Sequence, residues 1–411
     1  MAKMKNVDRI ELFLTLLFAI SVFLWKPGMY VSSGLITFYL LARSAIDHDY
    51  RKMVWSSQIA KVSLAMFLLG ILTSSISAEN FSDVSWMARK TLFLPVIVFF
   101  VFALTHERNR MAAITGLIAS FWIACVLSLH KYGWTLSFGG RMEGTWPQGT
   151  WDTLLGLFFT FMVLSFKWMP RSVLKLAIYG LTTLMALLML ILAGGRAPWL
   201  GSILSLTIFF VFFNRDKRVV WAILISGALI AMLTTTVLEE RTKPVIDRLS
   251  SVVNTTTDGS NWIRLKLWEI GTAQLVQLAK DDPLELIFGG GAESYNPKQA
   301  EFFKTMPFDE ADRARLKANG YPSGDSHNTY IDNALRHGVL WAIAMLLYLV
   351  WLCTRFSTKA IQSNPTSLIL LTNLLIVGMF YTVVPHFVTL FFVLFIACLG
   401  IYKSEKSPDS L

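Results

Sequence analysis

Long apolar stretches separated by short polar connections make up most of this 411-residue chain. A helix that crosses a membrane needs about 20 mostly apolar residues, and about twelve stretches approach that length. They cover residues 10–26, 29–43, 59–77, 90–105, 111–130, 151–167, 174–193, 198–213, 219–238, 338–354, 366–384 and 387–402. The pattern predicts an all-α polytopic membrane protein with about twelve transmembrane helices.

One long polar passage interrupts this pattern. It separates transmembrane helices 1–9, in residues 1–238, from helices 10–12 and a tail, in residues 338–411. The passage itself, residues 239–337, has apolar stretches on both sides, so we expect one large helical loop at a membrane surface. The chemistry of the protein is expected to take place in this loop.

Helices and breaks are expected to alternate within the loop. The polar cluster at 258–261 supplies N-cap side chains for a helix over about 262–280. One face of that helix carries Arg264, Trp268, Gly271 and Leu275. The Asp-Pro pair at 282–283 ends it, the glycines at 289–291 form a loop, and 307–319 predicts a short charged helix.

The composition supports a membrane protein, because 54% of the residues are hydrophobic and only 16% are charged. Soluble domains have about 25% charged residues. The net charge of +10 does not indicate nucleic acid binding, since the basic residues are spread over short connections and form no single stripe. The three cysteines, Cys125, Cys353 and Cys398, lie in apolar stretches. They are predicted to be small buried apolar residues that form no disulfide framework.

The distribution of Lys and Arg predicts the orientation in the membrane. One alternating set of connections is the richer in basic residues and is therefore cytoplasmic, which places both termini in the cytoplasm. Residues 239–337 then lie outside, together with the connections that hold Arg141 and Arg196. Arginines reach the outer face from three connections against the usual charge bias, which suits an anionic, phosphate-bearing ligand.

His327 is the first candidate for chemistry. Asp325 and Asn328 lie beside it, just before an apolar stretch. An imidazole has an ordinary pKa of about 6.5, so it is suited to taking a proton. The alternative is an interfacial histidine that bonds only loop backbone. His337, at the start of the next helix, is expected to cap that helix or lie at the interface.

Three arginines are candidates for anion binding. Arg196 follows two glycines in a tight turn between apolar stretches, where it needs an anionic partner or has to snorkel to the headgroups. Arg264 shares a helix face with Trp268, a face that either pairs with phosphate or rests on lipid. Arg141 lies in a glycine-rich connection and has the same two interpretations.

Several other functional classes lack their motifs in this sequence. No Gly-rich loop ends in Lys-Ser/Thr, so no nucleotide cradle of that kind is present. His327 and His337 do not have the spacing of a metal site, and there is no Gly-x-Ser-x-Gly elbow. We therefore expect no metal, no nucleotide and no cofactor.

The histidine motif resembles the signature of the O-antigen ligase and polymerase superfamily. In that signature a His and a small amide or hydroxyl residue precede a nine-residue gap, a Gly, two residues and a Gly, Thr or Tyr. His327, Asn328 and Gly338 match these positions. The last position departs from the signature, because it holds Trp341.

Further features are similar to the same superfamily. The Gly195-Arg196 turn and the helix with Arg264 and Trp268 resemble its two arginine positions. About twelve spans with one large outer loop between the ninth and tenth are also its layout, which is that of GT-C-like glycosyltransferases. The resemblance therefore covers nearly the whole chain.

The resemblance implies an inverting, metal-independent glycosyltransferase on the periplasmic face of the Gram-negative inner membrane. An O-antigen ligase transfers O-antigen polysaccharide from undecaprenyl pyrophosphate, the donor, to lipid A-core oligosaccharide, the acceptor. It implies His327 as the base and Arg196, Arg264 and Arg141 as pyrophosphate ligands. The supporting residues would be Asn328, Asp325, Trp268 and Gly338. Membrane lipid surrounds the chain, and no nucleic acid or nucleotide takes part.

Other functions fit parts of the same pattern. An O-antigen polymerase would use the same chemistry with a second lipid-linked glycan as acceptor, and transfer to a protein is a third possibility. A transporter of an anionic lipid or solute would place arginines along a transmembrane path and have inverted repeats, which the sequence does not show. The motif leaves the glycan, the core sugar and the oligomeric state open.

Overall fold

The computed structural model describes residues 2–77, 80–91, 93–134, 141–166, 172–213, 259–318, 321, 325–357, 365–382, 387–399 and 401–402. Its first helices are α1 (Ala2–Leu24), α2 (Lys26–Ile46), α3 (His48–Ser56), α4 (Gln58–Ser77), α5 (Phe81–Thr91), α6 (Phe93–Ala103) and α7 (Glu107–Lys131). They are followed by α8 (Gln148–Ser165), α9 (Val173–Ala193), α10 (Arg196–Ile208) and the π-helical η2 (Phe209–Phe213).

The second half of the chain is also helical. It comprises α13 (Gly259–Asp281), α14 (Pro283–Phe288), α15 (Tyr295–Thr305), α16 (Glu310–Ala318), α17 (Thr329–Arg355), α18 (Pro365–Gly378) and α19 (Phe387–Leu399). Two short strands, β1 (Phe356–Ser357) and β2 (Ile401–Tyr402), pair antiparallel. The prediction of an all-α polytopic membrane protein is confirmed for the residues that the structure describes.

Seven helical segments within the described ranges are long and apolar enough to cross a membrane. They are Lys26–Ile46, Gln58–Ile76, Phe81–Ala103, Glu107–Lys131, Val173–Ala193, Arg196–Phe213 and Thr329–Arg355. Two shorter apolar helices lie near the C-terminus. The predicted number of about twelve is not confirmed. The stretch 219–238 lies outside the described residues, as does the first part of the predicted loop, 239–258.

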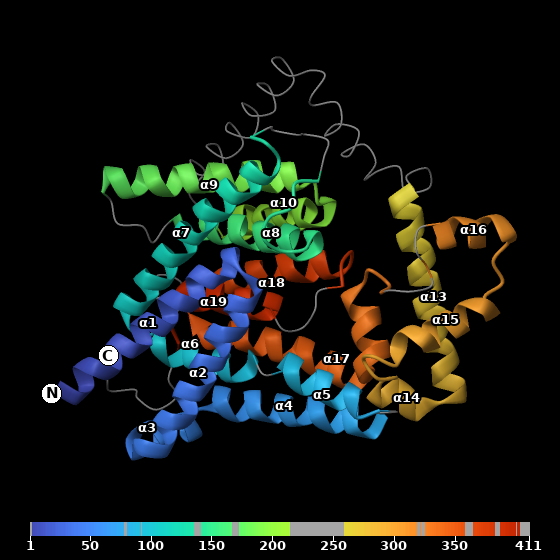
Figure 1. Cartoon of the computed structure of the whole chain (residues 1–411), viewed down its shortest axis with the longest axis horizontal. Coiled ribbons are helices and arrows are strands. Elements are labelled where there is room, and N and C mark those ends of the chain that lie inside the picture. The colour runs from blue at the N-terminus through green and yellow to red at the C-terminus, as the bar shows by residue number, and fades with distance from the viewer. Residues whose placement is uncertain are drawn as a thin grey trace.

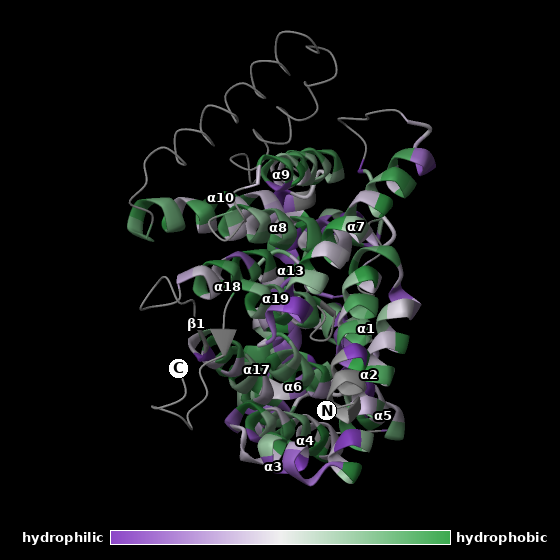
Figure 2. Cartoon of the chain, turned by 90° about the vertical axis from the view of Figure 1, so that its left-hand side faces the viewer, coloured by the Kyte–Doolittle hydropathy of each residue, from purple (hydrophilic) through white to green (hydrophobic). Residues whose placement is uncertain are grey.

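The apolar core is centred on α8, whose residues from Trp151 to Ser165 are all buried. Aromatic rings surround it: Phe158 contacts Phe23 at a centroid distance of 4.8 Å and Phe121 at 4.9 Å. Edge-to-face and tilted ring contacts of this kind add to the stability gained from burial. The neighbouring helices α9 and α10 are also largely hydrophobic, as the colouring by hydropathy shows (Figure 2).

Small residues allow α8, α10 and α18 to pack closely. A Cβ added at Gly156 would lie 2.9 Å from Pro198, and one at Gly201 would lie 2.9 Å from Asn373. The Asn373 amide donates to Thr160 Oγ1 at 2.7 Å. Close backbone approach with polar bonds across it is typical of helix packing in membranes. These helices form the rigid base from which Arg196 projects.

Helices α13 to α16 lie at one end of the bundle, opposite the end where α1 begins and where α3 lies (Figure 1). A buried carboxylate fastens this group to the apolar helices. Asp83 on α5 accepts bonds from the backbone N–H of Glu293 at 2.7 Å and from the Ser294 hydroxyl at 2.7 Å. A Cβ at Gly291, where φ is +85°, would meet the same carboxylate at 2.7 Å. The predicted glycine loop is thus a docking loop.

Candidate functional site

A cavity of about 370 Å³ opens between α10, α13 and the segment that follows α18. Arg196 and Arg264 enter it from separate elements, and Asn261 lies beside them. The rest of the wall is mainly apolar and includes Trp268 and Phe380. The described residues that line it include no acidic side chain. The cavity therefore combines positive charge with apolar surface.

The turn before α10 directs Arg196 to the cavity. Gly194 ends α9 with φ +71°, a left-handed conformation that glycine adopts without steric cost. Gly195 follows, and a Cβ there would lie 2.5 Å from Oδ2 of the buried Asp152 on α8. Both glycines are thus required for the tight turn that the sequence predicts. Arg196 is the first residue of α10.

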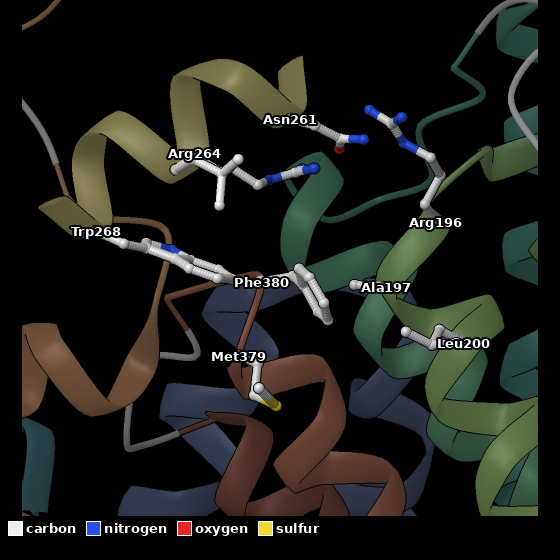
Figure 3. Close-up of a pocket in the computed structure, with 9 residues that line it drawn as sticks. Arg196, Ala197, Leu200, Asn261, Arg264, Trp268, Met379 and Phe380 are labelled. Carbon is white, nitrogen blue, oxygen red and sulfur yellow. The ribbon is translucent and has the colours of Figure 1, made fainter. Parts of the chain in front are cut away.

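Arg264 and Trp268 form the opposite wall, one turn apart on α13 (Figure 3). The Trp268 ring lies 5.8 Å from that of Phe380, and the Arg264 guanidinium lies 5.7 Å from the centre of the Tyr381 ring. The Tyr381 hydroxyl donates to Asp152 Oδ2 at 3.3 Å. Residues from α8, α13 and the end of α18 therefore fix the two cationic walls relative to each other.

The imidazole of His327 is held at both nitrogens. Nδ1 lies 2.7 Å from Asp325 Oδ1, and Nε2 lies 2.9 Å from the Tyr321 hydroxyl. The same carboxylate oxygen accepts the backbone N–H of His327 at 3.1 Å, which helps to hold this residue at φ +52°. Burial raises the pKa of Asp325, but its hydrogen bonds with His327 and the charges of His327 and Arg336 outweigh this, and the pKa falls below its usual value.

The residues after His327 begin α17. Asn328 caps the helix, because its Oδ1 accepts the backbone N–H of Tyr330 at 3.0 Å and of Ile331 at 3.2 Å. The buried Asp332 accepts the backbone N–H of Ser326 at 2.9 Å and its hydroxyl at 2.8 Å. The histidine loop is therefore fastened on both sides of His327.

Direct bonds connect the histidine loop to the cavity wall. The Thr329 hydroxyl donates to the Tyr381 carbonyl at 2.6 Å, and the Thr382 hydroxyl donates to Asp332. Tyr381 and Thr382 directly follow Met379 and Phe380, which line the cavity. The charge of Arg264 also lowers the pKa of Tyr321, although burial and Asp325 raise it more. The histidine loop is thus fastened to the segment that forms one wall of the cavity, although His327 itself is not among the residues that line it.

The model of the family described as O-Antigen ligase matches residues 181–346. This segment belongs to the O-antigen ligase family. It contains Arg196, Arg264, Asp325, His327, Asn328 and Gly338, so the motif resemblance noted in the sequence and the family match coincide. The family indicates a glycosyltransferase of the O-antigen ligase or polymerase type. No curated protein matches the chain.

Gly338 of the O-antigen ligase motif has a structural role in this chain. It bends α17 at φ +83°, where a Cβ would lie 2.1 Å from the Ile287 carbonyl oxygen at the end of α14. Beside it, the backbone N–H of Gly290 donates to the Leu335 carbonyl at 2.8 Å. The glycine permits the backbone of the docking loop to reach α17.

His337 is buried between Trp86 and Trp341. This location differs from the predicted capping or interfacial one.

Arg141 lies outside the segment that matches the O-antigen ligase family and is not among the residues lining the cavity. Its guanidinium is exposed and contacts Gln148 Oε1 at 3.3 Å. Its charge nevertheless acts on Tyr381, whose carbonyl and ring belong to the site. Arg141 is therefore a peripheral cation near the cavity.

The sequence reasoning missed three residues of this site: Tyr321, Asp152 and Tyr381. Asp152 had a signal, because it is the one acid in the apolar stretch 151–167 and charged residues inside membrane helices are usually functional. Tyr321 and Tyr381 had none, since both are recognised only by contacts across the fold. Among the described residues no group of three or more His, Cys, Asp or Glu side chains could hold a metal ion.

Proposed function

We propose that this protein is an O-antigen ligase. It transfers O-antigen polysaccharide from undecaprenyl pyrophosphate to lipid A-core oligosaccharide at the periplasmic face of a Gram-negative inner membrane. The observation that carries the proposal is that Arg196 and Arg264, from separate elements of the matched segment, enter one cavity with an apolar wall. Guanidinium groups bind phosphate oxygens two at a time, and apolar surface suits a polyprenyl chain.

In the proposed reaction His327 acts as general base. Nε2 takes the proton of the acceptor sugar hydroxyl while that oxygen attacks the anomeric carbon of the donor. The bond from this carbon to the phosphate oxygen breaks, and attack from the opposite side inverts the configuration. Asp325, at 2.7 Å from Nδ1, stabilises the imidazolium that forms.

The arginines act on the leaving group. Undecaprenyl pyrophosphate departs with the bonding electron pair, so negative charge grows on its bridging oxygen. Arg196 and Arg264 are already in position before the reaction, and preorganised donors of this kind stabilise the transition state without reorganisation. The energy comes from the donor itself, so the proposed reaction needs no nucleotide.

The proposal is tested by the lipopolysaccharide pattern of a deletion strain on a gel. We expect loss of the O-antigen ladder with accumulation of lipid-linked polymer, and recovery with the wild-type gene. His327→Ala and Arg196→Ala should fail to restore the ladder at normal protein levels. Arg51→Ala, which removes an exposed arginine on α3, should restore it and is the matched control. A core-plus-one-unit band in the deletion strain would contradict a ligase and indicate a polymerase.

A further inference from the structure

The base candidate has no ring nitrogen available for a substrate. Asp325 lies 2.7 Å from Nδ1 of His327, and the Tyr321 hydroxyl lies 2.9 Å from Nε2. The proposed transfer needs one of these nitrogens to take a proton from the acceptor sugar. One of the two contacts therefore has to give way during the reaction.

The direction of the two hydrogen bonds identifies which contact gives way. The carboxylate of Asp325 can only accept, and its pKa lies below the usual value, so Nδ1 carries the ring proton. In the neutral imidazole that a general base requires, Nε2 then has the lone pair, and the Tyr321 hydroxyl donates to it. The acceptor sugar has to give its hydroxyl proton to this lone pair. The Tyr321 hydroxyl therefore occupies the position that the acceptor hydroxyl needs.

Tyr321 is well placed to hold this position. Its ring packs against the cluster of Leu267, Ile270, Phe303, Met306 and Leu316, and its backbone N–H donates to the Leu316 carbonyl at 3.1 Å. The rings of Tyr321 and His327 are nearly perpendicular, at 88°. Burial and the charge of Asp325 raise the pKa of Tyr321, so its hydroxyl keeps its proton and remains a donor.

Burial does not protect the imidazole from water. The His327 side chain is 39% exposed, so solvent reaches the ring wherever no other group covers it. An uncovered base beside an activated donor would promote hydrolysis, and transferases have to exclude that side reaction. Among the described residues, the Tyr321 hydroxyl is the group that bonds Nε2.

We propose that the Tyr321 hydroxyl masks Nε2 of His327 until the acceptor sugar displaces it, and so prevents the enzyme from hydrolysing its own donor. The proposal rests on the transferase function proposed above. Removal of the hydroxyl would let a water molecule bind Nε2. The water oxygen would then attack the anomeric carbon, its proton would pass to Nε2, and the bond from that carbon to the pyrophosphate oxygen would break. The products would be free glycan and undecaprenyl pyrophosphate.

The test uses the full-length protein in lipid nanodiscs with undecaprenyl-pyrophosphate-linked glycan, with and without lipid A-core acceptor. We expect Tyr321→Phe to release free glycan without acceptor about fivefold faster than wild type, a factor that matches the loss of one ordinary hydrogen bond. Transfer to the acceptor should persist. Tyr348→Phe is the matched control, since it removes a tyrosine hydroxyl on α17 that bonds Ser63 Oγ at 2.6 Å instead of His327.

Two further measurements make the result specific to His327. Free glycan release should disappear in the double variant with Tyr321→Phe and His327→Ala. Diethyl pyrocarbonate should modify His327 faster in Tyr321→Phe than in Tyr348→Phe, as followed by peptide mass spectrometry. This second measurement does not depend on the identity of the substrate.

Each contrary result has a separate meaning. Wild-type protein that transfers nothing to lipid A-core would overturn the ligase function. Wild-type transfer with no extra hydrolysis in Tyr321→Phe would overturn the mask alone. Loss of both transfer and hydrolysis in a folded Tyr321→Phe protein would also overturn it, because the hydroxyl would then be passing the proton instead of covering the base.

Discussion

Arg196 and Arg264 line the same cavity, yet the geometry of each head group is expected to matter as much as its charge. Arg196→Ala and Arg264→Ala should each lower the transfer rate by about 10²-fold or more, the usual cost of removing one preorganised charge-stabilising donor. Arg196→Lys keeps the charge but loses the planar fork, so we expect it to lose most of the activity as well. Initial rates and donor KM of purified protein measure both effects. Full activity of the Lys variant would reduce the contact to simple charge.

The carboxylate of Asp325 orients the imidazole and stabilises its charged form. Asp325→Asn should lower the transfer rate by about 10²-fold, in the range typical of general acid-base contributions. The folded-state pKa of Asp325 is below its usual value, so the carboxylate stabilises the fold above the ordinary carboxyl pKa, and this is lost as the pH falls through the lowered one. Melting temperatures of the two proteins should therefore differ near neutral pH and converge in acid. A constant difference across that range would contradict this role.

The positions of single residues could be predicted from the sequence where a local motif fixes them. Arg196 and Arg264 stand in a recognisable turn and on a recognisable helix face, and the structure brings both to one cavity. The role of His327 as a base stays a prediction. The contact of Tyr381 with Asp152 joins residues separated by 229 positions, so no local pattern indicates it. Such partners depend on how α8, α13 and α18 pack together.

At the scale of elements, the bend of α17 depends on Gly338. Gly338→Ala should lower the melting temperature strongly, because positive φ costs a non-glycine residue about 1–3 kcal/mol and the added Cβ would meet backbone at 2.1 Å. The matched control is Gly34→Ala on α2, where an added Cβ meets nothing within 4 Å. That change should be neutral or stabilising by up to about 1 kcal/mol. Equal melting temperatures of the two variants would contradict the assigned contact.

The docking loop depends on a single buried carboxylate. Asp83→Ala removes the acceptor of the Glu293 N–H and the Ser294 hydroxyl, and leaving such donors without a partner costs about 1–3 kcal/mol each at buried positions. We expect faster limited proteolysis near residues 289–295 and weaker transfer. The control is Asp49→Ala, which removes an exposed acid on α3. Unchanged proteolysis in Asp83→Ala would show that other contacts hold the loop.

Element prediction succeeded for the long apolar helices, for α13 and for the short α16, and it missed other short helices. The predicted helix over about 262–280 is α13, Gly259–Asp281, and the predicted charged helix is α16. Helices α14 and α15, of 6 and 11 residues, were missed because such short stretches show no clear helical period. The start of α17 was placed at residue 338, but the Asn328 cap begins it nine residues earlier, at Thr329.

At the scale of the whole molecule, different polar elements lie at the two ends of the bundle. The start of α1 and helix α3 lie at one end, and α13 to α16 lie at the other (Figure 1). Helix α3 carries Arg51 and Lys52, which belong to the basic set of connections predicted to be cytoplasmic. The site residues on α13 and in the histidine loop belong to the opposite end. If the basic end faces the cytoplasm, the cavity faces the periplasm.

This orientation can be measured with single introduced cysteines, because the native cysteines should give little labelling of their own. Cys125, Cys353 and Cys398 are all free and buried, so a membrane-impermeant maleimide should label the wild-type protein poorly. Lys317→Cys places an exposed thiol on α16, and Lys52→Cys places one on α3. We expect Lys317→Cys to react in cells whose outer membrane alone is permeable, and Lys52→Cys to react only after the inner membrane is opened. The reverse pattern would put the cavity on the cytoplasmic side and would contradict the proposed transfer at the periplasmic face.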